Sequence, residues 1–432
     1  MNFNTVALIG YGVSNRAVLS YFTKNGIHPT VRNENPCDLP DSIHFIFGDG
    51  YLLTNEDLII RSPSVRPDKI SGYGYITTEA SFALSLAKSK KIGITGSDGK
   101  STTSTLIFMM LEKSGKAYLC GNIGKPVIDF VPCAEENSFI VSELSSFQLM
   151  DFDASLDTCV VTNITENHLD WHTSMGEYID AKKNIVLKSS EAILNYDDRT
   201  VREFASCKSA ENITYFSLKE TKKPEECAHF VTVDGGYLCY DGTKIVKTDE
   251  IKLKGKFNLM NAMAAAGAVW KYVSASDIQD VLSSFEGVKS RMQFVGKSAG
   301  VSFFDSSIDS TPSRTSSTVS AFDKSKTVLI MGGYDKNLTY DILGRELFGI
   351  KAIVICGANR EKIYKAVCGS CYDIAVTESF DNAVRVAFSK AEYGDSVLLS
   401  PASASFDMFE NYRERSLRFC KIVSELDKRQ DL

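Results

Sequence analysis

The segment of residues 92–103 reads IGITGSDGKSTT and limits the possible folds of this chain more than any other segment. A short apolar run ends at Gly96, and a largely apolar stretch without glycine or proline follows Ser101. This order predicts a strand, a glycine turn and a helix. Glycines allow successive backbone N–H groups to converge on phosphate oxygens at the start of a helix. The segment therefore predicts a phosphate-binding loop.

Two side chains beside the second glycine suit the same ligand. Lys100 supplies a point charge for the outer phosphates, and Ser101 supplies a hydroxyl for Mg²⁺. The spacing G-x-x-G-K-S is shorter than the more familiar G-x-x-x-x-G-K-S form, so a glycine turn with a chance lysine is the alternative. The strand before the turn and the helix after it favour the phosphate interpretation.

Length and composition exclude several classes of protein. A chain of 432 residues is too long for one ordinary core and predicts two or three domains. No apolar run approaches the ~20 residues of a membrane span, and the N-terminus has no basic leader. A formal charge of −6 argues against a broad nucleic-acid surface, and eleven scattered cysteines suit reduced thiols. We therefore expect a cytoplasmic protein without membrane or nucleic-acid partners.

Residues 1–88 begin with an apolar strand followed at residues 10–12 by Gly-Tyr-Gly, the pattern of a Rossmann-type βα turn. Asn15 replaces the third glycine of that pattern, and Arg32 follows the second strand, where an NAD enzyme places an acid. Arg32 suits the 2′-phosphate of NADP, but a nucleotide diphosphate bound without hydride chemistry is equally consistent. Ser62 follows a third strand and marks either another ligand edge or a plain surface turn.

Polar residues follow several apolar strands in residues 89–287. Glu143 comes just after the strand predicted at 139–141, and His168 follows the strand predicted at 159–161. Because ligands gather outside the carboxyl ends of strands in open α/β sheets, we expect these loops to face one crevice with the phosphate loop. A carboxylate and a histidine there suit Mg²⁺ and its waters. Taken alone, Glu143 is more typical of a residue near a helix N-cap, and His168 of a surface residue.

Two further features of this region are ambiguous. Asn258 and Asn261 lie on one face at the start of an Ala-rich helix predicted at 262–272, where they either bind a ligand or cap the helix. Lys182 lies in another predicted helix, in a position typical of a solvated lysine. Sequence alone gives neither feature a single function.

Strands and helices alternate again from about residue 288. Strands predicted at 327–331, 352–356 and 396–399 each end in a glycine or serine turn, which predicts a doubly wound domain. The fold class is therefore α/β with three domains. These are a Rossmann-like domain at 1–88, a central P-loop ATPase-type domain at 89–287 and a second Rossmann-like domain at 288–432.

Motifs from all three regions carry a family resemblance. They read GSDGKSTT, GNIGKP, ELSSFQL, NITENHLDWH, YIDAK, FNLMN and SRMQF. In this order and spacing the chain resembles the Mur ligases, ATP-dependent enzymes that form amide bonds in peptidoglycan precursor synthesis. GGYDKN and LLSPASASFDMFENYRERS are similar to the branch that adds D-glutamate to UDP-N-acetylmuramoyl-L-alanine. The resemblance covers the whole chain.

The resemblance implies a UDP-sugar domain, an ATPase domain and a domain for the incoming amino acid, in that order. It implies that ATP phosphorylates the L-Ala carboxylate and that the D-Glu amine attacks the resulting acyl phosphate. It also implies two Mg²⁺ sites, the second open to Mn²⁺, a carbamate on Lys182, and a monomer that acts on small-molecule substrates.

The resemblance further implies roles for individual residues. The residues implied for ATP are Gly96, Ser97, Asp98, Gly99, Lys100, Ser101, Thr102, Asn258, Asn261 and Arg291. Those implied for the UDP-sugar are Gly12, Val13, Ser14, Asn15, Arg32, Ser62 and Asn122, and those implied for D-Glu are Ser310, Lys336, Ser405 and Tyr412. The implied catalytic residues are Lys100, Glu143, His168 and Lys182. The implied metal ligands are Ser101, Glu143, His168 and Lys182.

Several positions depart from the family pattern. Residues 97–98 are Ser-Asp where Thr-Asn is commoner, a mild change. Ser290 stands for the usual histidine, so one nucleotide contact is lost, and Ile308 falls where some relatives carry a lysine near the amino acid. Arg32 and Ser64 differ from common residues of the first domain and leave uracil recognition open.

Three other functions remain open from the sequence. A sister ligase would add a different amino acid, and the third domain would decide which. An NADP-dependent redox enzyme would use the first domain but leaves the central motifs unexplained. A non-catalytic nucleotide-binding scaffold has no need of Lys100, Glu143, His168 and Lys182, so their presence favours an enzyme.

Overall fold

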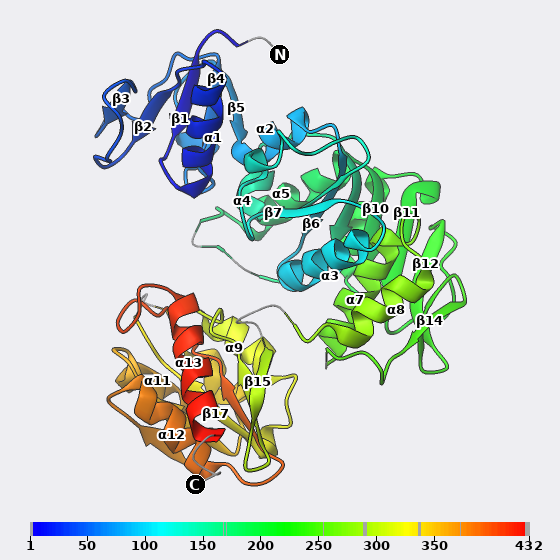
Figure 1. The fold of residues 1–432 in the computed structure, drawn as a ribbon, viewed down its shortest axis with the longest axis vertical. Helices are drawn as coiled ribbons and strands as arrows, with labels where there is room; N and C mark the ends of the chain where they lie inside the picture. Colours follow the sequence, from blue (N-terminus) through cyan, green and yellow to red (C-terminus); the bar gives the residue numbers. More distant parts are fainter. Residues whose placement is uncertain are drawn as a thin grey trace. The chain divides into compact units, whose positions relative to one another are not determined.

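The computed structural model describes residues 3–166, 168–169, 171–253, 255–287, 292–335, 338–371 and 373–427. The chain folds into two compact units. The first unit comprises Met1–Lys252 and Phe257–Phe285, and the second comprises Leu253–Lys256 and Glu286–Leu432. Figure 1 shows both units, coloured along the chain.

The first unit begins with a parallel five-stranded sheet in the order β3-β2-β1-β4-β5. This order is that of a Rossmann-like unit, so the fold expected for the N-terminal region is confirmed. Strands β1 and β4 are buried throughout, as central strands of a covered parallel sheet should be. The elements are β1 (Val6–Ile9), α1 (Val13–Lys24), β2 (Thr30–Asn33), β3 (Phe45–Phe47), β4 (Leu58–Arg61), η1 (Pro67–Lys69), β5 (Tyr75–Thr78) and α2 (Glu79–Leu86).

The same unit contains a nine-stranded sheet in the order β14-β13-β12-β11-β10-β9-β6-β8-β7. Strands β6 to β12 run parallel, and β12, β13 and β14 form antiparallel hairpins at one edge, joined by Gly-Gly and Asp-Gly turns. The elements are β6 (Lys90–Thr95), α3 (Lys100–Glu112), β7 (Ala117–Gly121), η2 (Val127–Asp129), β8 (Phe139–Glu143), α4 (Ser146–Leu149), β9 (Leu156–Val161), α5 (Met175–Leu187), β10 (Ser189–Asn195), α6 (Arg199–Glu203), η3 (Phe204–Cys207), η4 (Ala210–Asn212), β11 (Ile213–Ser217), β12 (His229–Asp234), β13 (Tyr237–Tyr240), β14 (Thr243–Lys247), α7 (Lys256–Val269) and α8 (Ala275–Ser284).

One hydrophobic core runs from the first sheet into the second. It includes Leu8 of β1, Ala83 of α2, Ile128 of η2 and Ile140 of β8. Helix α2 packs against η2, so it joins the two sheets rather than merely linking them along the chain. The shared core explains why these two regions form one compact unit, whereas the sequence predicts a division near residue 88.

The strand order of the nine-stranded sheet reverses beside β6. The chain passes from β6 through α3 toward β7 on one side, and from β9 through α5 toward β10 on the other. The loops that follow β6 and β9 therefore meet at a topological switch point, the usual place for a ligand in an open α/β sheet.

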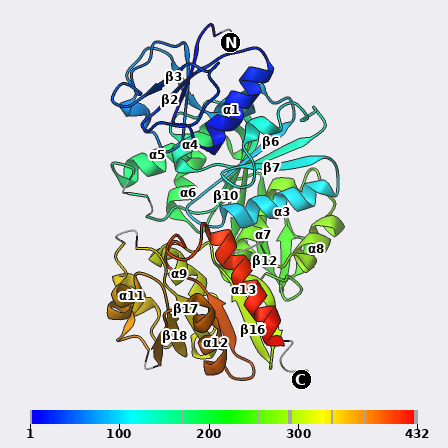
Figure 2. The same cartoon turned by 60° about the vertical axis from the view of Figure 1, so that its left-hand side comes forward.

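The second unit is built on a six-stranded sheet in the order β15-β16-β20-β17-β18-β19, parallel except for β15. Along β17, Val328 and Ile330 join a core with α12 and α13, while Leu329 and Met331 join a second core with α10 and α11. Figure 2 shows α12 and α13 side by side on one face. The elements are β15 (Gln293–Ser298), β16 (Val301–Asp305), α9 (Pro312–Val319), η5 (Lys324–Lys326), β17 (Thr327–Met331), α10 (Asp341–Glu346), β18 (Ala352–Ile355), α11 (Arg360–Val367), β19 (Ile374–Val376), α12 (Phe380–Lys390), β20 (Ser396–Leu399) and α13 (Tyr412–Asp427).

Helix α7 differs from its sequence-based prediction. It begins at Lys256 and ends at Val269, earlier at both ends than the helix expected at 262–272. Asn258 and Asn261 therefore lie inside the helix. The Asn261 side chain bonds to Asn258 (3.4 Å) and to Thr103 of α3 (3.3 Å), so the pair packs one helix against another.

The cysteines agree with the expectation of reduced thiols. All eleven cysteines are free thiols. Burial raises the pKa of the Cys159 thiol to about 12, which keeps it protonated and unreactive. Within the described ranges, no helix is both long and apolar enough to cross a membrane.

Candidate active site

The phosphate loop is shaped by two glycines that no other residue can replace without strain. Gly96 has φ 144° and Gly99 has φ 83°, both in the region that favours glycine. A Cβ on Gly99 would lie 2.2 Å from Asn261 Oδ1. Helix α3 then starts at Lys100, and its first backbone bond runs from Thr103 N to Gly99 O. The N–H groups before Thr103 lack intrahelical acceptors, which suits an anion at this end of α3.

The Ser97 side chain and the backbone of Asp98 hold the loop in shape. The Ser97 hydroxyl bonds to the Tyr178 hydroxyl (2.8 Å), and the Ser97 N–H donates to Asn163 O (2.8 Å). The Asp98 N–H donates to Asn163 Oδ1 (2.9 Å), and Thr162 Oγ1 donates to Asp98 O (2.6 Å). The loop after β9 thus fixes the loop after β6, as the switch point requires. A direct contact of the Ser97 hydroxyl with ATP finds no support in these bonds.

Glu143 brings together three segments that are far apart in the sequence. It ends β8 and is buried, and its Oε2 accepts a hydrogen bond from Ser101 Oγ (2.6 Å). Its Oε1 accepts one from Asn122 Nδ2 (2.8 Å), and its carbonyl accepts one from the Asn122 N–H (2.8 Å). The carboxylate is therefore fixed beside the N-terminus of α3, where the sequence places the phosphates.

Two lysines meet at the carbonyl of Gly96. Lys100 Nζ donates to Gly96 O (2.8 Å) and Ser97 O (2.9 Å), and Lys182 Nζ donates to Gly96 O (2.8 Å) and Thr95 Oγ1 (3.2 Å). Lys182 is only 1% exposed, so its helix position is not that of a solvated lysine. Burial, together with the positive charge of Lys100, lowers the pKa of Lys182 well below its usual value, although Glu143 acts in the opposite direction.

His168 lies on an exposed turn after β9. Its backbone has φ 56°, and its ring lies 4.9 Å from the ring of Phe147. Across the described ranges, no group of three or more His, Cys, Asp or Glu side chains could hold a metal ion. One carboxylate and one hydroxyl nevertheless fit Mg²⁺, which keeps several waters and uses substrate phosphates as further ligands. Glu143 and Ser101 are the residues placed to hold it.

Asn258 and Asn261 lie behind the loop, both buried. The contact of Asn261 with Thr103 and its close approach to Gly99 place α7 against the start of α3. The third residue implied for the nucleotide base side, Arg291, lies outside the described residues, as does Ser290.

In the first sheet, the side chain of Asn15 ties the βα turn to β4. It is fully buried, and its Nδ2 donates to the carbonyls of Ile9 (3.1 Å), Gly10 (2.8 Å) and Ile60 (3.1 Å). Asn15 stands at the position of the missing third glycine. Its implied role toward the UDP-sugar stays a prediction.

The other UDP-sugar residues implied for residues 1–88 lie around the same turn. Gly12 is the N-cap of α1, followed by the exposed Val13 and the half-buried Ser14. Arg32 pairs with Glu56 (3.1 Å), so its charge is already balanced, which weakens the NADP interpretation. Ser62 Oγ bonds to Ser64 Oγ (3.0 Å). These contacts leave the N-terminus of α1 as the open edge of the turn.

The loops implied for D-Glu meet at the switch point between β17 and β20. Ser405 is buried, and its carbonyl accepts from the N–H groups of Met408 (3.1 Å) and Phe409 (2.8 Å). Tyr412 is the first residue of α13, and the Ser310 N–H donates to Ile308 O (2.8 Å). Lys336 lies outside the described residues.

A fully buried arginine supports these loops. Arg415 Nη2 donates to Ser307 O (2.9 Å) and Ser403 O (3.0 Å), and Nη1 donates to Ala404 O (3.3 Å). Burial lowers the pKa of Arg415 to about 10, so it remains charged at neutral pH. Its cation neutralises carbonyl dipoles and does not face a ligand.

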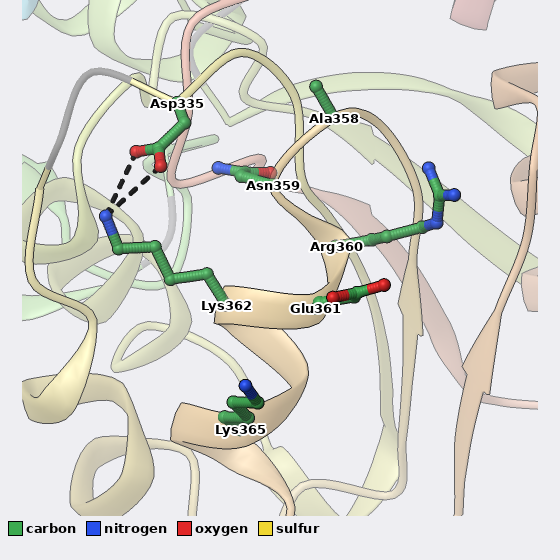
Figure 3. A pocket seen from close by; sticks show the side chains of 7 residues that line it. All are labelled: Asp335, Ala358, Asn359, Arg360, Glu361, Lys362 and Lys365. Carbon is green, nitrogen blue, oxygen red and sulfur yellow. Dashed lines mark hydrogen bonds and ion pairs between the residues drawn. The ribbon is translucent and has the colours of Figure 1, made fainter.

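A pocket of about 440 Å³ opens beside α11 in the second unit. Figure 3 shows Lys362 reaching from α11 to Asp335, an ion pair of 3.2 Å, while Arg360 and Glu361 extend away from that pair. Asn359 accepts from the Gly333 N–H (3.0 Å), so the pocket adjoins the turn after β17. Its lining residues are Asp335, Ala358, Asn359, Arg360, Glu361, Lys362 and Lys365.

Sequence reasoning missed several residues that build the site. Asn163 and Thr162 follow β9 directly, so their strand-end position could have indicated them. Tyr178 and Arg415 gave no local signal, because their partners are distant in sequence and their burial depends on tertiary packing. Arg66 gave no local signal either, because its partners Trp171 and Glu177 are distant in sequence.

Comparisons with known proteins place this geometry in a family. Residues 94–269 match the Mur ligase middle domain, and residues 290–403 match the glutamate ligase domain of Mur ligases. A Mur ligase from Thermotoga maritima, UDP-N-acetylmuramate-alanine ligase, superposes with a TM-score of 0.63 at 16% identity and covers 98% of this chain and 100% of its own. The chain belongs to the Mur ligase family.

Relatives that match the full length carry a more particular name. The UDP-N-acetylmuramoylalanine–D-glutamate ligase of Clostridium botulinum strain Hall is 35% identical over 455 residues, covering 99% of this chain and 98% of the relative. The ligase of the same name from Clostridium perfringens strain 13 is 36% identical over 449 residues, covering 98% and 96%. The family resemblance of the motifs is thereby confirmed.

Proposed function

We propose that this protein joins D-glutamate to UDP-N-acetylmuramoyl-L-alanine at the expense of ATP, in peptidoglycan precursor synthesis. The full-length relatives support the choice of substrates by their names. The structural observation that carries the proposal is the contact of Ser101 and Asn122 with Glu143 at the N-terminus of α3. A hydroxyl, a carboxylate and the N-terminus of a helix in one place suit a metal-bound triphosphate.

The reaction proceeds in two transfers. The L-Ala carboxylate oxygen attacks the γ-phosphorus of ATP, and the bond from that phosphorus to the β-phosphate oxygen breaks. The products of this step are ADP and an acyl phosphate. The neutral D-Glu amine then attacks the acyl carbon, loses a proton, and the tetrahedral intermediate collapses to the amide with release of inorganic phosphate. Neither transfer needs a protein nucleophile, so catalysis depends on positioning and charge neutralisation. Lys100 and the N–H groups of α3 supply that neutralisation.

Mur ligases use ATP and Mg²⁺, and Ser101 with Glu143 would hold the ion in this chain. The ion, when bound, offsets negative charge on the transferring phosphoryl group. Our proposal adds a second metal, Mg²⁺ or Mn²⁺, served by His168 and Lys182. The lowered pKa of Lys182 supports this role, because a neutral amine adds to CO₂, loses a proton and becomes a carbamate with anionic oxygens.

The remaining assignments follow the sheets. We assign the UDP-sugar to residues 1–88, ATP to residues 89–287 and D-Glu to residues 288–432, with a monomeric protein in the cytoplasm. Ser310, Lys336, Ser405 and Tyr412 would hold the two carboxylates of D-Glu. The hydrogen bonds from Arg415 to Ser307 O and Ser403 O support this assignment, because they fix the loops that carry Ser310 and Ser405.

The test is phosphate release from ATP with UDP-N-acetylmuramoyl-L-alanine and an amino acid, supplied together and singly. We expect release only with both, and D-Glu preferred over L-Glu, D-Asp, L-Lys and meso-diaminopimelate. A preference for L-Lys or diaminopimelate would replace the proposal with a sister ligase. Release without any acceptor would point to a simple ATPase.

A further inference from the structure

Arg66 lies in the first-sheet part of the chain, just before η1, yet its guanidinium bonds to the segment after β9. Nη1 donates to Trp171 O (2.6 Å) and to Glu177 Oε2 (3.1 Å), and Nη2 donates to Glu177 Oε1 (2.9 Å). The guanidinium also lies 5.0 Å from the centre of the Trp171 ring. The Arg66 side chain thus contacts both the backbone and the ring of Trp171.

A second hydrogen bond to Trp171 and the ion pair between Arg66 and Glu177 strengthen this contact. Trp171 Nε1 donates to Ser64 O (3.3 Å), so two residues of the same loop hold it. The hydrogen bonds from Arg66 lower the pKa of Glu177 to about 2, although burial opposes them. Both partners are therefore charged at every pH at which an enzyme works, and the pairing is bidentate, the geometry that suits guanidinium best.

The next residue is anchored from the other side. His172 is buried, its Nδ1 bonds to Glu177 Oε2 (3.2 Å) and its Nε2 bonds to Ser146 Oγ (2.9 Å). Ser146 is the first residue of α4. The turn at 171–172 is therefore fixed between the first sheet, α4 and the start of α5.

The anchored residues determine where His168 lies. The N–H groups of Trp171 (3.1 Å) and His172 (2.9 Å) donate to His168 O. The ring of Phe147 contacts the rings of His168 (4.9 Å), Trp171 (4.5 Å) and His172 (5.6 Å). A left-handed backbone at a residue other than glycine persists only where its surroundings hold it, and these contacts do so at His168.

We propose that Arg66 is a positioning residue for catalysis, because it fixes the turn that presents His168. This inference rests on the proposed function, in which His168 serves a metal. The same loop carries Ser62, whose carbonyl accepts from the Val65 N–H (2.9 Å), while the Val65 carbonyl accepts from Arg61 Nη1 (2.9 Å). Residues 61–66, next to the residues implied for the UDP-sugar, therefore contact the turn that carries His168. Through this contact the first-sheet region helps to position the residue proposed to bind the second metal.

The opposing explanation is that Arg66 only fastens two sheets together. In that case its loss would lower stability but leave the folded enzyme with normal turnover and a normal Mg²⁺ requirement. A positioning role instead changes kcat and the Mg²⁺ concentration for half-maximal rate, with little change in the KM for D-Glu.

The experiment compares Arg66→Met, Arg66→Lys and Glu177→Gln in the full chain. We expect Arg66→Met to lower kcat about 10- to 100-fold, since a small misplacement of a reacting group is enough for that loss, and to raise the Mg²⁺ requirement. Arg66→Lys should recover part of the rate, because lysine keeps the charge but not the fork. The double variant Arg66→Met/Glu177→Gln should be no worse than the worse single variant. Thermal melting verifies that each variant is folded at the assay temperature.

The matched control is Arg199→Met. Arg199 forms an exposed ion pair with Glu203 (3.5 Å), with side chains 88% and 66% exposed, so it tests the loss of an arginine in the same unit. We expect unchanged kcat and an unchanged Mg²⁺ requirement. Equal effects at Arg66 and Arg199 would overturn the proposal.

A second readout needs no turnover. The chain has two tryptophans, and Trp270 stacks on Tyr240 at 4.4 Å. In a Trp270→Phe background, Arg66→Met should increase the quenching of Trp171 fluorescence by acrylamide, because the indole ring becomes more accessible. Movement of Trp171 with unchanged kcat and Mg²⁺ requirement, or no movement at all, would overturn the positioning role. If the wild-type protein releases no phosphate, the proposed function fails instead, and quenching alone decides whether Arg66 holds the turn.

Discussion

The phosphate loop after β6 and the paired loops after β17 and β20 occupy the same kind of topological position, yet they treat charge in opposite ways. In the phosphate loop, Lys100 bonds to Gly96 O and Ser97 O, where a triphosphate would offer a better partner. In the second unit, Arg415 is fully buried and its Nη1 and Nη2 donate to loop carbonyls. A cation near an open loop is available to a ligand, whereas a cation under a loop fixes the shape of the loop.

The difference teaches how the two sites should respond to mutation. Groups that exchange one partner for a phosphate act on the transition state, so their loss should lower kcat. Groups that hold a loop in place act on binding geometry, so their loss should raise KM and lower stability. Each prediction below can contradict this division between the β6 loop and the β17 and β20 loops.

The largest effect is expected at Lys182. Lys182→Ala should lower kcat on the order of 10³-fold, because it removes the group proposed to carry the carbamate at the metal. A short carboxylic acid such as formate should restore part of the rate by replacing the missing anionic oxygens. The control is Lys222→Ala on an exposed loop. Full activity of Lys182→Ala would return this residue to a packing role.

Lys100→Ala should follow, with a loss of about 10²-fold in kcat, because the charge that develops on the γ-phosphate loses its nearest cation. The KM for D-Glu should hardly change, since the lysine bonds to carbonyls of the β6 loop. Steady-state kinetics with each substrate varied in turn separate the two constants. A rise in the KM for D-Glu alone would break the comparison.

Arg415→Met should act in the opposite way. We expect the KM for D-Glu to rise about 10-fold, and the free energy of unfolding to fall by about 3 kcal/mol, because buried carbonyls lose their donor. Arg413→Met, a variant of an exposed residue on the same helix, is the matched control. Denaturant unfolding and the KM values for D-Glu and ATP provide the measurements. A fall in kcat at unchanged KM would contradict the loop-fixing role.

Glu79 allows a test of how burial of a carboxyl group changes stability with pH, with a smaller expected effect. It is buried in α2, and its Oε1 accepts from the Ile128 N–H (2.8 Å). Burial raises its pKa from 4.5 to about 7, with the N–H of Ile128 opposing and Asp129 adding to the rise. Between these pH values the folded protein holds a proton that the unfolded chain has lost, so stability falls as pH rises from about 4.5 through about 7.

The shift corresponds to about 3 kcal/mol at pH 8. Glu79→Gln, which cannot ionise, should therefore be more stable than the wild type at pH 8 and should lose this pH dependence. Melting temperatures from pH 5 to 8 measure the difference, with the exposed Glu112→Gln as the control. Parallel curves for Glu79→Gln and wild type would show that the carboxylate has another source of stabilisation.

The sequence predicts what short segments and strand ends determine. The turn at Gly96 and Gly99 was predictable because only glycine adopts its backbone angles, and Glu143 was predictable because carboxyl strand ends share an edge. The sequence also gave the parallel sheets, since alternating apolar runs and helices allow few other folds.

What the sequence did not predict depends on partners far along the chain. Arg66 and Trp171 are 105 residues apart, and no local pattern marks either as buried against the other. No local pattern indicates that the Asn15 amide bonds to three backbone carbonyls. The merging of the first two cores through α2 is likewise absent from any local pattern. Such contacts depend on tertiary packing, which local propensity does not encode.

The burial of Lys182 has a consequence for chemical selectivity. Burial lowers the pKa of the Lys182 amine and so favours its nucleophilic neutral form, yet only 1% of the residue is exposed. If Lys182 becomes a carbamate as we propose, we expect it to react with CO₂ more readily than with bulky acid anhydrides or aldehydes, because the surrounding protein covers the amine. Burial would then select the modifying reagent by its size.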